Sequence, residues 1–122
     1  MIYLIAHLHV LPGQELAFQT YEKTVLPIFK EYGGKVLQAL RPLRPMPSSH
    51  STKKVATKKV YTGTQADRFE NEVPYEIHVL SIPSESALAA YRNDPRIANL
   101  STERNRIMQK TDIVISKELV IY

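Results

Sequence analysis

The sequence contains no cysteine. It therefore has no disulfide framework, no thiolate zinc site and no cysteine nucleophile. No apolar run reaches the roughly 20 residues that a membrane helix needs, and the N-terminus has no basic leader and no small-residue cleavage site. We expect a soluble cytoplasmic protein without a membrane partner. The 122 residues, 43% hydrophobic and 23% charged, predict one globular domain over residues 1–122.

Glycine is also scarce, with only four residues. They stand at positions 13, 33, 34 and 63, and this spacing does not form a glycine-rich phosphate loop. The serines at 81, 84 and 86 have no nucleophile-elbow setting. The sequence therefore argues against P-loop nucleotide chemistry and against a serine hydrolase.

Acidic residues are absent between Tyr32 and Ala66. This segment instead carries seven basic residues: Lys35, Arg41, Arg44, Lys53, Lys54, Lys58 and Lys59. The remaining chain holds nine basic residues against all twelve acidic ones, although the formal net charge is +4. A single basic segment of this kind can line an anion site, bind nucleic acid or an acidic partner, or simply be solvated.

Hydrophobic periodicity predicts the first three elements. Residues 2–10 alternate apolar and mixed positions with a period of two, which indicates a strand. A helix is expected over residues 14–32, with its inner face formed by Ala17, Tyr21, Val25, Ile28 and Tyr32. Gly33 and Gly34 end this helix, and a strand follows over residues 35–43.

A long insert is predicted at about residues 42–73, because three closely spaced prolines exclude a central strand. Within it, residues 54–61 could form a short exposed strand. A third main strand is expected over 75–82, followed by a helix with Ser84 as N-cap. Asp94 and Pro95 interrupt this helix and restart it as cap and first helical residue, through to Ile107. The final strand is expected over 111–122.

This order predicts an α+β, ferredoxin-like βαββαβ fold with a four-stranded antiparallel sheet and a long insert between its second and third strands. Two helices can cover only one face of such a sheet. The opposite face remains apolar at Tyr3 and Ile5, so it needs a cover. We expect a homodimer in which two sheets pack face to face as a dimeric α/β barrel.

Two segments, YGGKVL at residues 32–37 and IPSESALAAYRNDP at 82–95, carry a family likeness. They resemble a family of small bacterial proteins known as the domain of unknown function numbered thirteen-thirty. The resemblance covers roughly residues 1–41 and 74–120 and implies membership of the dimeric α/β-barrel superfamily. That superfamily includes cofactor-free monooxygenases, muconolactone isomerases, haem-containing chlorite dismutases and effector-binding domains.

The resemblance also implies three polar site positions. Arg104 matches a helix arginine of the family. The family has an arginine on its second strand, and Ala39 occupies that position in this sequence. Arg41, two residues later on the same face of the strand, is a possible substitute. Ser81 stands where the family has an acidic residue.

The histidines are the best chemical candidates in the sequence. His7 and His9 are two residues apart on one strand, so they project from the same face, opposite the helices and toward the expected barrel interior. They could act as acid and base or as two metal ligands. His78 is expected to point under the helices with Glu76 as its partner, which leaves no third ligand, so no metal site is predicted. His50 falls in the insert.

Two function classes follow. The first is a small-molecule site inside each barrel half, formed by Tyr3, His7, His9, Ser81, Arg41 and Arg104, without a cofactor. His7 or His9 would be the base and Arg41 would hold an anion during proton transfer, isomerisation or cofactor-free oxygenation. The alternative is a non-enzymatic protein whose basic insert, residues 41–59, binds nucleic acid or an acidic partner. The insert has no aromatic residue before Tyr61, so stacking on nucleic acid bases is poorly supported and nucleic acid is the less favoured partner.

Overall fold

The first strand, β1 (Ile2–Val10), is one of the two inner strands of the sheet. In the computed structural model, which describes residues 1–46 and 73–122, Leu4, Ala6 and Leu8 of β1 are buried. Their neighbours Tyr3, Ile5 and His7 lie on the opposite face, since successive strand residues point to opposite sides. The predicted alternation is confirmed.

The sheet has four antiparallel strands in the order β2-β3-β1-β4. The other strands are β2 (Lys35–Leu40), β3 (Glu76–Ile82) and β4 (Met108–Ser116). Ala6 pairs with His78 on one side and with Ile113 on the other, so these three side chains share a face. The predicted α+β, ferredoxin-like class is confirmed.

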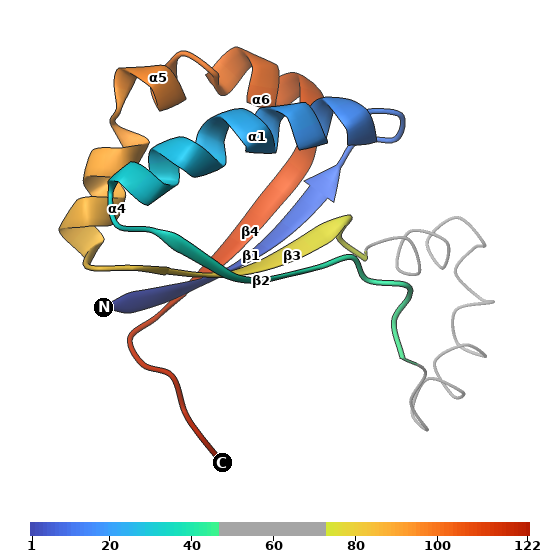
Figure 1. The fold of residues 1–122 in the computed structure, drawn as a ribbon. Coiled ribbons are helices and arrows are strands. Elements are labelled where there is room, and N and C mark those ends of the chain that lie inside the picture. Colours follow the sequence, from blue (N-terminus) through green and yellow to red (C-terminus); the bar gives the residue numbers. More distant parts are fainter. Residues whose placement is uncertain (47–72) are drawn as a thin grey trace, which may run out of the picture.

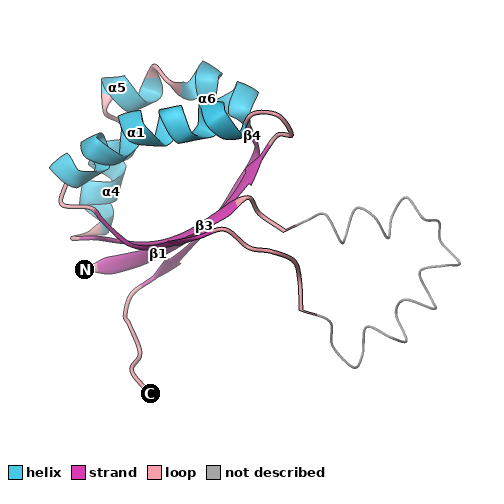
Figure 2. Ribbon diagram, turned by 45° about the vertical axis from the view of Figure 1, so that its right-hand side comes forward, coloured by secondary structure: helices cyan, strands magenta, loops and turns pink. Residues whose placement is uncertain are grey.

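All the helices described lie over one face of the sheet, as Figures 1 and 2 show. They are α1 (Glu15–Glu31), α4 (Glu85–Arg92), α5 (Pro95–Ala98) and α6 (Ser101–Ile107). The predicted caps are confirmed, because the Ser84 hydroxyl accepts the Ala87 N–H at 3.1 Å and the Asp94 carboxylate accepts the Arg96 N–H at 2.8 Å. None of these helices, within the two described ranges, is long and apolar enough to cross a bilayer.

The chain departs from the predicted bounds in three places. The helix expected to run through to Ile107 is interrupted after Ala98, where the Leu100 N–H bonds to the Ile97 carbonyl at 3.0 Å and closes a tight turn. The last strand begins three residues early and ends at Ser116, because Ser116 pairs with Tyr3 almost at the start of β1. The second strand stops at Leu40, because Leu40 pairs with Ile77 and β3 begins just before it, at Glu76.

The insert is only partly described. Residues 47–72 lie outside the described residues, and with them His50, the short strand expected over 54–61 and most of the basic segment. Binding of nucleic acid or an acidic partner through residues 41–59 therefore stays a prediction.

Helix α1 is attached to the sheet at two separate points. Near its start, Phe18 packs in one buried cluster with Leu8 and Met108, and near its end Phe29 packs in another with Leu4 and Ile82. Of the expected inner face, Val25 and Ile28 are buried, and Ala17, Tyr21 and Tyr32 pack partly buried against the two clusters. The prediction omitted Phe18 and Phe29, which are the most deeply buried residues of the helix. The middle of α1 is thus held over the sheet without filling the space beneath it.

Candidate functional site

That space is a cavity of about 450 Å³ between the helices and the sheet, here called the helix-side cavity. Apolar side chains supply most of its wall: Leu4, Ala6, Leu8, Val25, Leu26, Phe29, Leu80, Leu88, Ile97, Ala98, Ile113 and Ile115. Ile113 and Ile115 on β4 are 53% and 51% exposed, so the cavity opens to solvent along that edge strand. An apolar pocket with a few polar groups is the usual form of a small-molecule site.

The first polar group in this wall is Glu22, from the middle of α1. Burial raises the pKa of its carboxyl from 4.5 to about 7, and the neighbouring Glu76 acts in the same direction. His78 and Arg104 oppose this rise. Within the described residues, the Glu22 carboxyl has no hydrogen-bond partner. A carboxyl with this pKa exchanges protons near neutral pH.

The second polar group is His78, buried on β3 with 4% exposure. Its Nε2 lies 2.6 Å from Oε1 of Glu76, and the other carboxylate oxygen, Oε2, accepts a 2.8 Å bond from Nε of Arg41. Because a carboxylate accepts, Nε2 is the nitrogen that donates to Glu76, and in the neutral ring Nδ1 is the one that carries a lone pair. No other described residue hydrogen-bonds to Nδ1. The predictions that His78 points under the helices and that Glu76 is its partner are confirmed.

The third polar group is Arg104 of α6. Its guanidinium donates a 2.8 Å hydrogen bond to the Thr111 hydroxyl on β4. It also lies near the Tyr21 phenol, whose pKa is raised by burial and pulled back by the charge of Arg104. The cavity thus brings together an acid, an imidazole and a cation from α1, β3 and α6.

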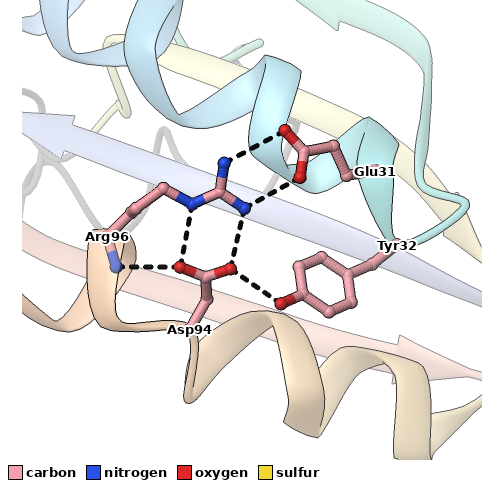
Figure 3. A network of polar contacts seen from close by, with 4 residues as sticks. All are labelled: Glu31, Tyr32, Asp94 and Arg96. Atoms are coloured by element: carbon pink, nitrogen blue, oxygen red, sulfur yellow. Dashed lines mark hydrogen bonds and ion pairs between the residues drawn. The ribbon is translucent and has the colours of Figure 1, made fainter.

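A polar network outside the cavity joins the end of α1 to the turn before α5, as Figure 3 shows. The Asp94 carboxylate accepts hydrogen bonds from the Tyr32 phenol at 2.7 Å and from the Arg96 side chain at 2.8 and 3.0 Å. Arg96 also donates to both carboxylate oxygens of Glu31. Because Arg96 and Tyr32 hold the pKa of Asp94 well below its usual range, the network stays charged in all but strong acid. It ties the turn between α4 and α5 to the end of α1.

The structure divides the six site residues predicted from the sequence between the two faces of the sheet. Tyr3, Ser81, His7 and His9 lie on the face away from the helices, where Tyr3 pairs with Ser81. On the same face, Nε2 of His9 is 4.0 Å from a carboxylate oxygen of Asp112.

Arg41 and Arg104 lie on the helix side instead, where Arg41 is bonded to Glu76 and Arg104 lines the helix-side cavity. The six residues therefore do not meet in one cluster within this chain.

Sequence reasoning missed Glu22 and treated His78 only as a structural residue. A signal for Glu22 was present: it stands four residues after Phe18 and three before Val25, and both of these are buried. A carboxylate on the buried stripe of an amphipathic helix is unusual enough to mark a site. Elsewhere, in residues 1–46 and 73–122, no three histidine or carboxylate side chains are grouped as a metal site would require.

No family model matches the chain, and no curated protein matches it in sequence. Solved structures do match. A protein of unknown function from Rhodopseudomonas palustris is 16% identical with a TM-score of 0.70, over 98% of this chain and 83% of its own. A dabb family protein with a ferredoxin-like fold from Mesorhizobium loti is 12% identical with a TM-score of 0.60, over 98% and 97%.

A third similar structure is that of a protein from Bacteroides thetaiotaomicron that is described as an antibiotic biosynthesis monooxygenase on the basis of its name alone. It is 14% identical with a TM-score of 0.59, over 98% of this chain and 90% of its own. At these identities the matches show a shared fold, and a fold does not select a function.

Proposed function

We propose that the helix-side cavity binds a small, mainly apolar molecule and transfers protons on it, with Glu22 as acid and His78 as base. The observation that carries the proposal is Glu22, a carboxyl with a pKa of about 7 and no hydrogen-bond partner in the described chain, in the wall of a 450 Å³ apolar cavity. A general acid works best when its pKa lies near the operating pH. Imidazole is the side chain whose ordinary pKa suits it to act as a base at the same pH.

The chemistry is a proton shift next to a carbonyl. The Nδ1 lone pair of His78 removes the proton from the adjacent carbon, and that C–H electron pair becomes the C=C bond of the enol. The carbonyl oxygen takes the proton of Glu22. Glu76 keeps the ring oriented and stabilises the imidazolium that forms, as a carboxylate does behind a catalytic histidine. No electrons are gained or lost, so the step needs no cofactor.

Isomerisation of a carbonyl compound is the simplest overall reaction of this kind. Proton removal is also the first step of cofactor-free oxygenation. The named monooxygenase among the structures with this fold is consistent with that extension.

The proposal includes the family and assembly predicted from the sequence. The face of the sheet away from the helices carries Ile5, Ile77, Val79 and Val114 side by side in the strand register. If a second copy of the chain covered this face, the result would be a homodimeric barrel like that of the bacterial family which the sequence resembles. We propose the cytoplasm as its location.

An exchange experiment tests the function. The probe is 2-tetralone, an apolar ketone with acidic protons next to its carbonyl, dissolved with the protein in D₂O and followed by proton NMR. The protein should accelerate loss of these proton signals. Glu22→Gln and His78→Gln should each slow the catalysed rate by about 100-fold, because a general acid or base commonly accelerates a reaction by at least that factor. Glu103→Gln, an exposed carboxyl on α6, is the matched control.

A blocking variant keeps the test independent of buried substitutions. Ala98 is exposed on α5 and lines the cavity, so Ala98→Phe should fill it and stop exchange, while Ala90→Phe on the exposed side of α4 should not. Exchange no faster than in buffer would refute the proposal. The site predicted around His7, His9 and Arg41 is tested in the same assay: loss of exchange in His7→Gln or His9→Gln, with Glu22→Gln unaffected, would move the chemistry to the other face.

A further inference from the structure

Arg104 is the cation best placed to act inside the helix-side cavity. It reaches in from α6 and is only partly exposed. Its Nη2 donates to the Thr111 hydroxyl, and its side chain also hydrogen-bonds to the Tyr21 phenol. A guanidinium has five N–H donors arranged to grip a carboxylate with two parallel bonds. Both partners are neutral hydroxyl groups, so they leave the charge of Arg104 unpaired and its remaining donors available to a ligand.

Below about pH 7, the other charged and titratable groups around the cavity leave Arg104 without an ion-pair partner. These groups are Tyr21 and Glu22 on α1, His78 with Glu76 on β3, and Tyr91 and Arg92 on α4. Glu76 is already hydrogen-bonded to His78 and Arg41. Glu22 is protonated below about pH 7 because of its burial. Among the described residues, no carboxylate forms an ion pair with Arg104.

We infer that the natural ligand of the helix-side cavity joins an apolar body to a carboxylate, and that Arg104 binds this carboxylate. The inference rests on the proposed function for the location of the site and adds the class of molecule. The apolar wall matches the body of such a ligand, and the guanidinium matches its anionic end. Arg92 also lines the cavity, but it is exposed, so its charge is weakened by water.

Two probes of the same shape separate charge from fit. These are 2-naphthoate and the neutral 2-naphthamide, each titrated into ¹⁵N-labelled protein at about pH 6, where Glu22, with its pKa of about 7, is mostly protonated. The naphthoate should bind at least about tenfold more tightly, as expected for charge-assisted hydrogen bonds in a sheltered site. The shifted amide signals should come from residues that line the cavity.

Variants assign the effect to Arg104. Arg104→Gln should remove the preference for naphthoate and leave naphthamide binding unchanged, whereas Arg106→Gln, exposed on the same helix, should change neither. Thr111→Val removes one of the two hydroxyl partners of Arg104 but keeps its charge, so it should keep the preference. If Thr111→Val behaves like Arg104→Gln, Arg104 is structural and the inference is wrong.

The failures of the two proposals can be told apart. Equal binding of both probes by the wild-type protein, or a preference that survives Arg104→Gln, would overturn the carboxylate inference and leave the cavity as a binding site. If neither probe binds, and Ala98→Phe leaves the tetralone exchange unchanged, both the inference and the proposed function are overturned.

Discussion

The phenol of Tyr32 donates a 2.7 Å hydrogen bond to the carboxylate of Asp94, although the two residues are 62 positions apart in the chain. Tyr32 ends α1 and Asp94 caps α5, so the bond joins two elements that form walls of the helix-side cavity. Asp94 performs three tasks at once, because it also accepts the Arg96 backbone N–H and pairs with the Arg96 guanidinium. One carboxylate therefore connects the end of α1 to the start of α5.

Substitutions of Asp94 should lower the thermal unfolding midpoint in a defined order. Asp94→Ala loses the cap, the ion pair and the Tyr32 bond, so it should be the least stable; Asp94→Asn should follow, and Tyr32→Phe should be mildest. The pKa of Asp94 is depressed, so its contribution is complete above its ordinary value of 3.8 and is lost only as the pH falls further. The wild type and Asp94→Asn should thus differ by a constant amount from neutral pH down to that value. A difference that fades between pH 7 and 5 would contradict this.

Glu22→Gln should stabilise the protein at high pH. The folded-state pKa of Glu22 is raised to about 7, so stability is greatest below its ordinary value of 4.5 and falls as the pH rises through 7. Urea unfolding at about pH 8 should show the variant more stable by on the order of 2 kcal/mol, and near pH 4.5 the two proteins should be nearly equal. Glu103→Gln is the exposed control and should show no such pH dependence. If the difference in stability between the wild type and Glu22→Gln is the same at pH 8 as at pH 5, then Glu22 is solvated and this prediction is wrong.

Glu76→Gln tests whether Glu76 positions His78. The amide keeps the shape but loses the charge that stabilises a protonated imidazole, so kcat for tetralone exchange should fall by about tenfold or more while KM changes little. Arg41→Gln removes the exposed partner of Glu76 and should have a much smaller effect. A parallel rise in KM would indicate a general loss of structure instead, and so would a fall in the yield of folded protein.

Gly34→Ala tests the close approach of α1 to the chain that follows it. Gly34 is buried, and an added Cβ would fall within the ring of Phe29, so the substitution should cost about 1–3 kcal/mol by overpacking. Gly13→Ala is a useful comparison, because Gly13 has a φ of +85° but open space around it. That variant should cost only about 1 kcal/mol of backbone strain. Denaturant midpoints of the two variants decide the order, and a Gly34→Ala protein as stable as wild type would mean that Phe29 is free to move.

Local signals in the sequence were sufficient for the elements and their order. The alternation of β1 and the caps at Ser84 and Asp94 were predictable because each depends on neighbours within a few residues. The bounds of β2 and β4 were predicted less well, since a strand ends where its partner ends, and that partner is distant in sequence.

The candidate site was less accessible from the sequence. The two histidines of β1 attracted attention because they are close in sequence, whereas Glu22, His78 and Arg104 are spread over three elements. The contact between Arg41 and Glu76 likewise spans 35 residues and depends on the register of β2 against β3.

Periodicity and capping signals by themselves determined the order of the elements and the two faces of β1, because alternation and capping are local properties of the chain. Only the tertiary structure decided where a small molecule can enter. The anchoring of Phe18 and Phe29 on the sheet sets the rotation of α1, and that rotation turns Glu22 toward His78 and Arg104. Burial then raises the pKa of Glu22 toward neutrality, a property that no residue has before the chain is folded around it.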